Sequence, residues 1–301
     1  MFLIQNGFLY TMAAKDAFEG DILVDGDRIL RVEPRIDPDT LDLEKVVDAK
    51  GLWVLPGLID VHMHLVRASA DDEKNERDVI ADALASGVTT QALWPEGGNG
   101  LCLVRHGACR MEQPPSPLYA LRQEDYTDTA LRDALSKARE NGHRIAVEVY
   151  GEGALRRIIA IGQETACPLV LTHLTGCADM AEDIARTGWE VIMGACVLRT
   201  GTDYALTAKL HRLGVPLALT SDYPATRLHH LPLSAGLCVR GGMVRHAALR
   251  AITIDAARLL RVDAACGSIE PGKRADFTFF DGDPLMLASA RVMTIAGGQT
   301  V

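Results

Sequence analysis

Apolar segments of strand length alternate with segments of helical periodicity from residue 57 to residue 264. Apolar runs bounded by turn residues predict strands over Val54–His62, Val88–Trp94, Leu101–His106, Pro117–Arg122, Ile145–Tyr150, Leu169–His173, Glu190–Ala195 and Val215–Ser221. Helical patterns separate most of them, over Asp128–Glu140, Gly153–Glu164, Ala178–Thr187 and Asp203–Leu213. This alternation favours parallel pairing, in a closed or a doubly wound sheet. The length of segment 57–264 is close to the lower limit of about 200 residues for a TIM (β/α)₈ barrel. This barrel is the α/β fold that we predict.

The third and fourth strands are the weak part of this predicted barrel. The segments that follow the second and third strands, Gly97–Gly100 and Glu112–Ser116, are too short to hold crossover helices. We therefore expect a short, partly degenerate barrel.

Both ends of the chain are rich in short strand patterns. They cover Phe2–Ile4, Phe8–Thr11, Asp21–Val24 and Arg28–Val32 at the start, and Ala275–Phe280 and Val292–Ile295 at the end. Turns of the Asp-Gly type separate several of them, which is typical of hairpins. We predict a small β-sandwich domain made of residues 1–56 with 265–301, and a metal-dependent hydrolase barrel made of residues 57–264.

Charge and composition limit the classes of binding partner and the cellular compartment that we expect. The net charge of -9 argues against a nucleic-acid or anionic-membrane surface, which would favour a basic face. No window holds eighteen uninterrupted apolar residues, and the seven cysteines include no CxxC pair. We expect a cytoplasmic protein with a small-molecule substrate and no nucleic-acid or membrane partner, and leave open whether it forms a homo-oligomer.

The strongest chemical pattern is a pair of histidines at the end of the first barrel strand. Positions two apart on a strand point to the same face, so His62 and His64 both face the barrel interior. Two imidazoles at that spacing can chelate one divalent ion. Histidines without a metal are the alternative for any isolated His-x-His.

Two later strands also end in a polar residue that could carry chemistry. Counting back by twos from His173 gives Leu171 and Leu169 on the inward face. The same count places Asp222 on the inward face of the last strand. A core histidine bonded to backbone and a carboxylate that caps the following turn are the alternatives.

The strand Ile145–Tyr150 places Glu148 and Tyr150 on one face and its β-branched residues on the other. The apolar set suits the helix layer, so Glu148 points inward at the level of the metal. A buried glutamate needs a cation or an arginine nearby. Metal ligand and salt-bridged structural residue both remain open for Glu148.

The segment Pro56–His64 resembles the first-strand signature of the amidohydrolase superfamily, and Ile252–Leu260 with Gly267–Phe277 resembles its return into the small β domain. The likeness is greatest to imidazolonepropionase-like and prolidase-like members. It implies hydrolysis of amide-type bonds at one or two metals. His62, His64 and His173 would bind the ion, and Asp222 would bind it and act as general base and acid.

This sequence also departs from the family pattern at some positions, and the resemblance suggests further site residues. Glu148 stands where related sequences usually carry a histidine. A lysine bridge between two ions is nearly excluded, because Lys137 and Lys209 lie on predicted helices. Glu124 is the best-placed substitute for a bridging carboxylate, ahead of two other glutamates at residues 96 and 112. His229, His230 and Tyr150 are candidates for substrate contact, and His106 ends a strand that could face the site.

These observations predict a metal-dependent amidohydrolase that acts on a small amide, cyclic amide or dipeptide-like substrate. Asp222 would take a proton from water, and His173 would stabilise the developing oxyanion. Zn²⁺ is the expected ion, with Mn²⁺, Fe²⁺ or Ni²⁺ as alternatives and one or two ions left open. A mononuclear deaminase and a degenerate metal-binding barrel are the competing interpretations.

Overall fold

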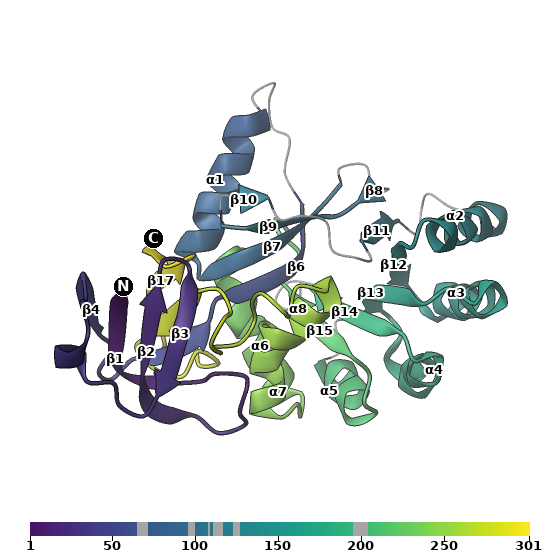
Figure 1. Cartoon of the computed structure of the whole chain (residues 1–301). Coiled ribbons are helices and arrows are strands. Elements are labelled where there is room, and N and C mark those ends of the chain that lie inside the picture. The colour runs from purple at the N-terminus through teal and green to yellow at the C-terminus, as the bar shows by residue number, and fades with distance from the viewer. Residues whose placement is uncertain (65–71, 96–99, 108, 111–116, 123–126, 195–203) are drawn as a thin grey trace.

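The computed structural model describes residues 1–64, 72–95, 100–107, 109–110, 117–122, 127–194 and 204–301 (Figure 1). Strands from both ends of the chain pair in one eight-stranded sheet, in the order β18-β17-β16-β5-β1-β2-β3, with β4 on β1. Their bounds are β1 (Phe2–Leu9), β2 (Phe18–Asp25), β3 (Arg28–Glu33), β4 (Lys45–Asp48), β5 (Trp53–Pro56), β16 (Phe277–Phe280), β17 (Arg291–Ala296) and β18 (Gln299–Thr300). This sheet is mixed, because β1 pairs parallel with β4 and β5 while the other pairs are antiparallel.

Two further sheets form the middle of the chain. One has the order β10-β9-β7-β6 and the other the order β15-β14-β13-β12-β11-β8. Their strands are β6 (Leu58–His64), β7 (Val88–Trp94), β8 (Gly100–Leu101), β9 (Leu103–His106), β10 (Cys109–Arg110), β11 (Leu118–Leu121), β12 (Arg144–Tyr150), β13 (Leu169–Thr175), β14 (Glu190–Gly194) and β15 (Leu217–Thr220). Parallel pairing joins β6 to β7 and runs from β11 through β15.

The predicted parallel direction of the third strand is wrong. Residues 101–106 form two short strands, of which β9 pairs antiparallel with β7 and β8 pairs antiparallel with β11. A parallel strand needs a crossover of a dozen or more residues, whereas only residues 95–102 separate β7 from β9. Among the described residues the sheets do not close into one barrel, and the observed architecture is a mixed α/β fold.

Helices cover the outer side of the middle sheets (Figure 1). They are α1 (Asp72–Ala85), α2 (Asp128–Glu140), α3 (Glu152–Thr165), α4 (Ala181–Thr187), α5 (Tyr204–Arg212), α6 (Leu231–Arg240), α7 (Arg245–Arg250) and α8 (Ile254–Leu260), with short 3₁₀ turns η1 (Pro38–Thr40), η3 (Ala178–Met180) and η4 (Leu228–His230). Thr127 caps α2 by accepting from the Ala130 N–H, and Gly188 ends α4 in the left-handed conformation. In the described part of the chain no helix is both long and apolar enough to span a bilayer.

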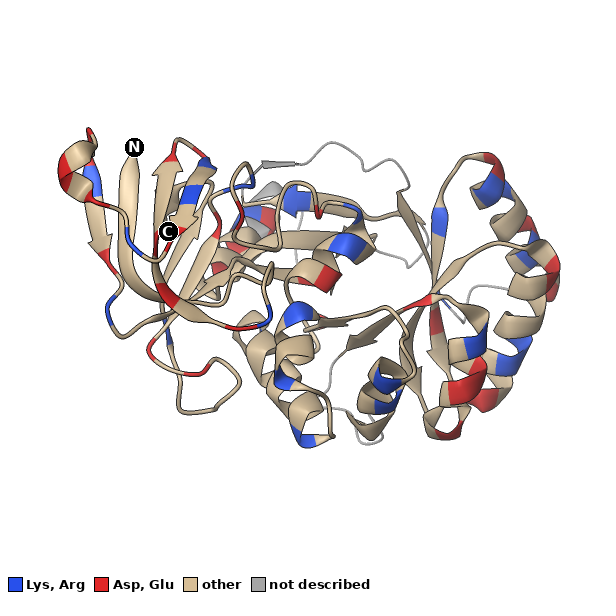
Figure 2. Cartoon of the chain, turned by 60° about the horizontal axis from the view of Figure 1, so that its bottom comes forward, with Lys and Arg blue, Asp and Glu red and all other residues tan. Residues whose placement is uncertain are grey.

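The two faces of the parallel strands pack in two different apolar clusters. Leu169 and Leu171 of β13 pack in the cluster that contains Leu155 and Ile158 of α3. The opposite face carries smaller side chains, which join α8 in a second cluster: Ala146, Val170, Ile192, Ala218, Ala256 and Ala257. The polar site residues described below lie at the carboxyl ends of these strands. In the view of Figure 2, basic and acidic residues are interspersed over the helices.

Candidate functional site

His62 and His64 end β6 with their rings turned toward each other. Their Nε2 atoms are 2.9 Å apart. The His62 ring is fully buried and stacks on Trp94, with ring centroids 3.7 Å apart and an angle of 9°. The Trp94 indole N–H in turn donates to the Val61 carbonyl. Stacking therefore fixes the ring of His62, whose Nδ1 has no hydrogen-bond partner in the described part of the chain.

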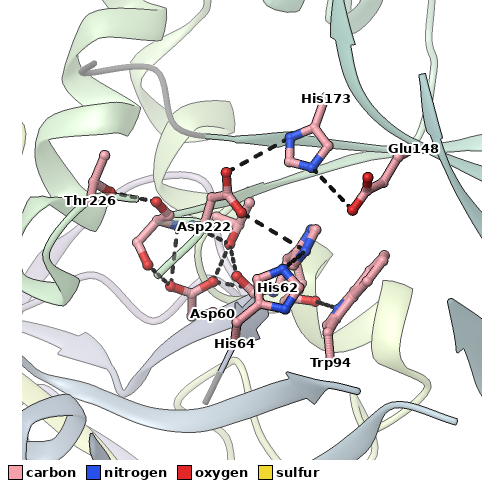
Figure 3. A network of polar contacts seen from close by, with 11 residues as sticks. Asp60, His62, His64, Trp94, Glu148, His173, Asp222 and Thr226 are labelled. Carbon is pink, nitrogen blue, oxygen red and sulfur yellow. Dashed lines mark hydrogen bonds and ion pairs between the residues drawn. The ribbon is translucent and has the colours of Figure 1, made fainter. Parts of the chain in front are cut away.

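Glu148 of β12, His173 of β13 and Asp222, which follows β15, converge on this pair (Figure 3). His62 Nε2 lies 3.9 Å from Asp222 Oδ1, and His173 Nδ1 lies 4.0 Å from Asp222 Oδ2. His173 Nε2 lies 3.9 Å from Glu148 Oε1. Two sets of donor atoms, each within 4.8 Å of one another, result: His62 with His64 and Glu148, and His62 with His173 and Asp222.

His173 reaches this site by a route that strict alternation does not predict. Leu169 and Leu171 face the helices, so the inward assignment of those two residues was wrong. Val170 and Thr172 are the residues that pair with Ala146 and Glu148 on the inner face. His173 and Leu174 have φ angles of 68° and 53°, which is the left-handed region. This irregularity in β13 breaks the alternation and turns the imidazole inward.

A buried carboxylate from β6 holds the end of β15. Asp60 accepts hydrogen bonds from the Ser221 amide at 3.1 Å, the Ser221 hydroxyl at 2.5 Å, the His62 amide at 3.3 Å and the Thr220 hydroxyl. The Thr220 hydroxyl also accepts from the Asp222 amide at 3.0 Å. Asp222 itself has a φ of 56°. This network connects the strand of His62 to the backbone that presents the Asp222 carboxylate.

Burial dominates the electrostatics of the cluster. Desolvation lowers the pKa of His62 well below its usual value, and His173, His64 and Arg122 lower it further. The imidazole is therefore neutral near pH 7, which is the form that binds metals. Desolvation also raises the pKa of Asp60, although the hydrogen bonds from Ser221 and Thr220 oppose that shift.

The donor set fits a divalent cation. Ligands about 2.0–2.2 Å from one ion lie roughly 3–4 Å from each other, and the separations of 2.9, 3.9 and 4.0 Å agree with that. When both neutral imidazoles carry their proton on Nδ1, two Nε2 lone pairs face each other, and a cation bound between them satisfies both. Imidazole and carboxylate together suit Zn²⁺ and its first-row neighbours.

A cavity of about 450 Å³ opens beside the cluster. It is lined by His64, Arg122, Glu148, Tyr150, His173, Asp222, Pro224 and Ala225. The Tyr150 ring stacks on His173 with centroids 5.5 Å apart. Arg122 was not among the residues predicted from sequence, although it ends a predicted strand, as His173 does. Asp60 was also missed, although it lies two residues before His62.

Other candidate residues lie elsewhere. His229 and His230 line a separate cavity of about 340 Å³ beside Phe280 and Met286. His106 is buried away from the cluster, where its Nε2 lies 3.0 Å from Asp276 Oδ1 of the segment before β16. Glu124, like the glutamates at 96 and 112, lies outside the described residues.

Known proteins share this fold and part of this sequence. An imidazolonepropionase of Pseudomonas aeruginosa is 26% identical over 352 residues, with 86% of this chain and 87% of the relative covered. Since this chain has 301 residues, the aligned stretch contains residues without a counterpart here. An amidohydrolase structure from Thermotoga maritima has a TM-score of 0.84 at 21% identity, covering 100% of this chain and 99% of the other.

A third comparison is a beta-aspartyl dipeptidase from Fervidobacterium islandicum, with a TM-score of 0.73, 17% identity and coverage of 99% and 95%. At these identities the two structures show the fold alone. A sequence model of the amidohydrolase family matches residues 104–301, which is more than half of the chain. On the strength of that match, the protein belongs to the amidohydrolase family.

Proposed function

We propose that this protein is a metal-dependent amidohydrolase that cleaves the carbon–nitrogen bond of a small amide, cyclic amide or dipeptide-like molecule. The observation that carries the proposal is the convergence of five polar side chains, of which all but His62 line one cavity: His62, His64, Glu148, His173 and Asp222. They come from three strands and from the segment that follows β15, and most of them are buried, where polar groups need partners. Membership of the amidohydrolase family supports the same chemistry.

The proposed ligands are the two histidines of β6 with Glu148, His173 and Asp222, and Zn²⁺ is the ion that this set favours. When bound, the ion supplies Lewis acidity, which lowers the pKa of water from 15.7 to about 7. The apolar surroundings of His62 and Trp94 keep bulk water from the inner side of the cluster.

Two side chains of the protein carry out proton transfer and stabilisation of the developing charge. Asp222 is almost buried and lies within 4.0 Å of His62 and His173. Its carboxylate accepts a proton from the attacking water and returns it to the leaving nitrogen. His173, stacked on Tyr150, orients the carbonyl oxygen and stabilises the charge that develops there.

The finer architecture belongs to this proposal as well. In a (β/α)₈ barrel β15 lies beside β6, and the contacts between these strands support that arrangement. The His64 amide donates to the Tyr223 carbonyl at 2.8 Å, and Asp60 joins β6 to Ser221. We propose that residues 57–264 form the barrel of a cytoplasmic enzyme, with the sheet of both termini as its accessory domain.

The test combines metal analysis with hydrolysis assays. We expect purified protein to hold one or two equivalents of a divalent metal, and His62→Asn to lose them. His143→Asn, at a histidine in a different cavity, is the matched control and should keep the metal. EDTA should abolish hydrolysis across a panel of amides, lactams and dipeptides, and added Zn²⁺ should restore it. Hydrolysis that survives complete metal removal would contradict the proposal, and ammonia release from purine, pyrimidine or guanidine-like compounds would assign a deaminase instead.

A further inference from the structure

Arg122 occupies a defined place in the wall of the candidate site. It follows β11, whose last residue Leu121 pairs with Val147 of β12. One step further along the register, residue 122 lies beside Glu148. Ala120 and Ala146 form the pair before, and both belong to the inner cluster. Arg122 is half-buried and lines the same cavity as Glu148 and Asp222.

The net charge of this cavity changes sign when it holds a divalent cation. Among the described residues that line the cavity, Glu148 and Asp222 are the carboxylates and Arg122 is the basic residue. Two negative charges and one positive charge leave the metal-free cavity with a net charge of about −1, if its histidines are neutral. A divalent ion whose bound water is neutral brings the sum to about +1. The loaded site therefore favours an anion, although the chain as a whole carries -9.

We propose that Arg122 binds an anionic group, a carboxylate in the first instance, on the substrate beside the carbon–nitrogen bond that is cleaved. This inference rests on the proposed metal-dependent hydrolysis and names the substrate class for it. The planar guanidinium offers a pair of parallel N–H donors that match the two oxygens of a carboxylate. The half-buried position strengthens the interaction relative to one in open water.

The geometry separates this role from that of the neighbouring residues. His64, Glu148, His173 and Asp222 face one another at the reacting end of the cavity. Arg122 approaches from β11, the strand next to Glu148, so an anion bound there would be held to one side of the reacting group. A substrate with an uncharged group at this place would lack the charge-assisted hydrogen bonds that an anion accepts from a guanidinium.

The test uses two matched pairs of compounds that differ only in charge. N-acetyl-L-alanine is compared with N-acetyl-L-alaninamide, and 5-oxoproline with its amide. Binding to the metal-loaded protein is followed by calorimetry and by tryptophan fluorescence, because Trp94 stacks on His62. Rates of hydrolysis are measured for whichever pair is cleaved. The variants are Arg122→Met and Arg122→Lys, with Arg156→Met on the exposed face of α3 as the control.

We expect Arg122→Met to weaken binding and kcat/KM for the anionic compounds by about 10–100-fold. The neutral partners should change by less than about threefold. Arg122→Lys should retain part of the preference, and Arg156→Met should change neither. Removal of the metal should abolish the preference for the anion in the wild-type protein.

Three results would overturn the inference. The first is an equal loss for the charged and the neutral compound. The second is a wild-type enzyme that binds neutral amides as well as anionic ones, which would leave the proposed hydrolase intact. The third is loss of the metal from Arg122→Met, which would show that Arg122 supports Glu148 instead. If none of these four compounds is hydrolysed, the binding comparison still decides the role of Arg122, and the wider panel of amides, lactams and dipeptides decides the proposed function.

Discussion

Substitution of Asp60 by Asn tests whether the link between β6 and β15 shapes the candidate metal site. Asp60 is completely buried, and its Oδ2 accepts from both the amide and the hydroxyl of Ser221. Its Oδ1 accepts from the Thr220 hydroxyl and the His62 amide. Asparagine has nearly the same size but one acceptor oxygen, so donors on one side of the group would meet an NH₂ group.

The magnitude follows from the donors that lose their acceptor. A buried donor without a partner costs about 1–3 kcal/mol, and two donors share each carboxylate oxygen. Removal of the buried charge returns part of this, since burial raises the pKa of Asp60 and therefore disfavours its charged form. We expect a net decrease of about 2–4 kcal/mol in the free energy of unfolding.

A second buried aspartate provides the control. Asp21 is 3% exposed and accepts from the Asn6 amide at 2.9 Å and the Ile36 amide at 2.8 Å, all within the terminal part of the chain. Asp21→Asn should lower stability in a urea titration by a similar amount. Because Asp60 holds the backbone of Asp222 through Ser221 and Thr220, only Asp60→Asn should also change the metal site.

The decisive measurement is therefore metal affinity, determined by competition with a chelator, together with the visible spectrum of the Co²⁺ form. Residues that support metal ligands commonly contribute 10–100-fold to affinity, and we expect about this loss for Asp60→Asn. Asp21→Asn should bind Zn²⁺ and Co²⁺ as the wild type does. Wild-type affinity and an unchanged Co²⁺ spectrum in Asp60→Asn would refute the reasoning, whatever the change in stability.

Three other predictions concern metal removal and two buried groups. Chelation should lower the stability by about 2.7 kcal/mol relative to protein with free metal at 100 times Kd, and equal melting temperatures would contradict this. His106→Ala should lower stability by about 3–5 kcal/mol, because it leaves the Asp276 carboxylate buried, and an unchanged urea midpoint would exclude that interaction. Burial raises the pKa of the Cys266 thiol to about 12, so mass spectrometry should find Cys266 unmodified by iodoacetamide at pH 8 in the native protein. Rapid labelling there would show that the thiol is accessible.

Much of the fold and of the cluster follows from local patterns. The strands that carry His62 and Glu148, and the strand that leads to Asp222, were predicted from segments of six to nine residues, and the structure brings these side chains together. Parallel strands place their carboxyl ends at one edge of a sheet, so residues that end separate strands meet there. The same rule would have included Arg122, which ends the predicted strand Pro117–Arg122.

The errors have physical causes. The third predicted strand reads as apolar and extended, but strand direction depends on the connection, and a short connection permits only antiparallel pairing of β9 with β7. The sequence did not identify Asp60 as a residue that supports the site, because an aspartate before a His-x-His pattern fits many roles. Its place became evident only from its contacts with Ser221, which is far away in sequence.

His173 shows why alternation fails where the chemistry lies. The rule of two holds while a strand stays extended, and it placed Leu169 and Leu171 on the face opposite to the one observed. At the carboxyl ends the backbone leaves the extended region, with positive φ at His173, Leu174 and Asp222. A non-glycine residue in that conformation costs about 1 kcal/mol or more and persists when its surroundings hold it. The hydrogen bond from the Asp222 amide to Thr220 provides such support, so the side chains that converge on the candidate metal site depend on local backbone strain that the hydrophobic pattern does not encode.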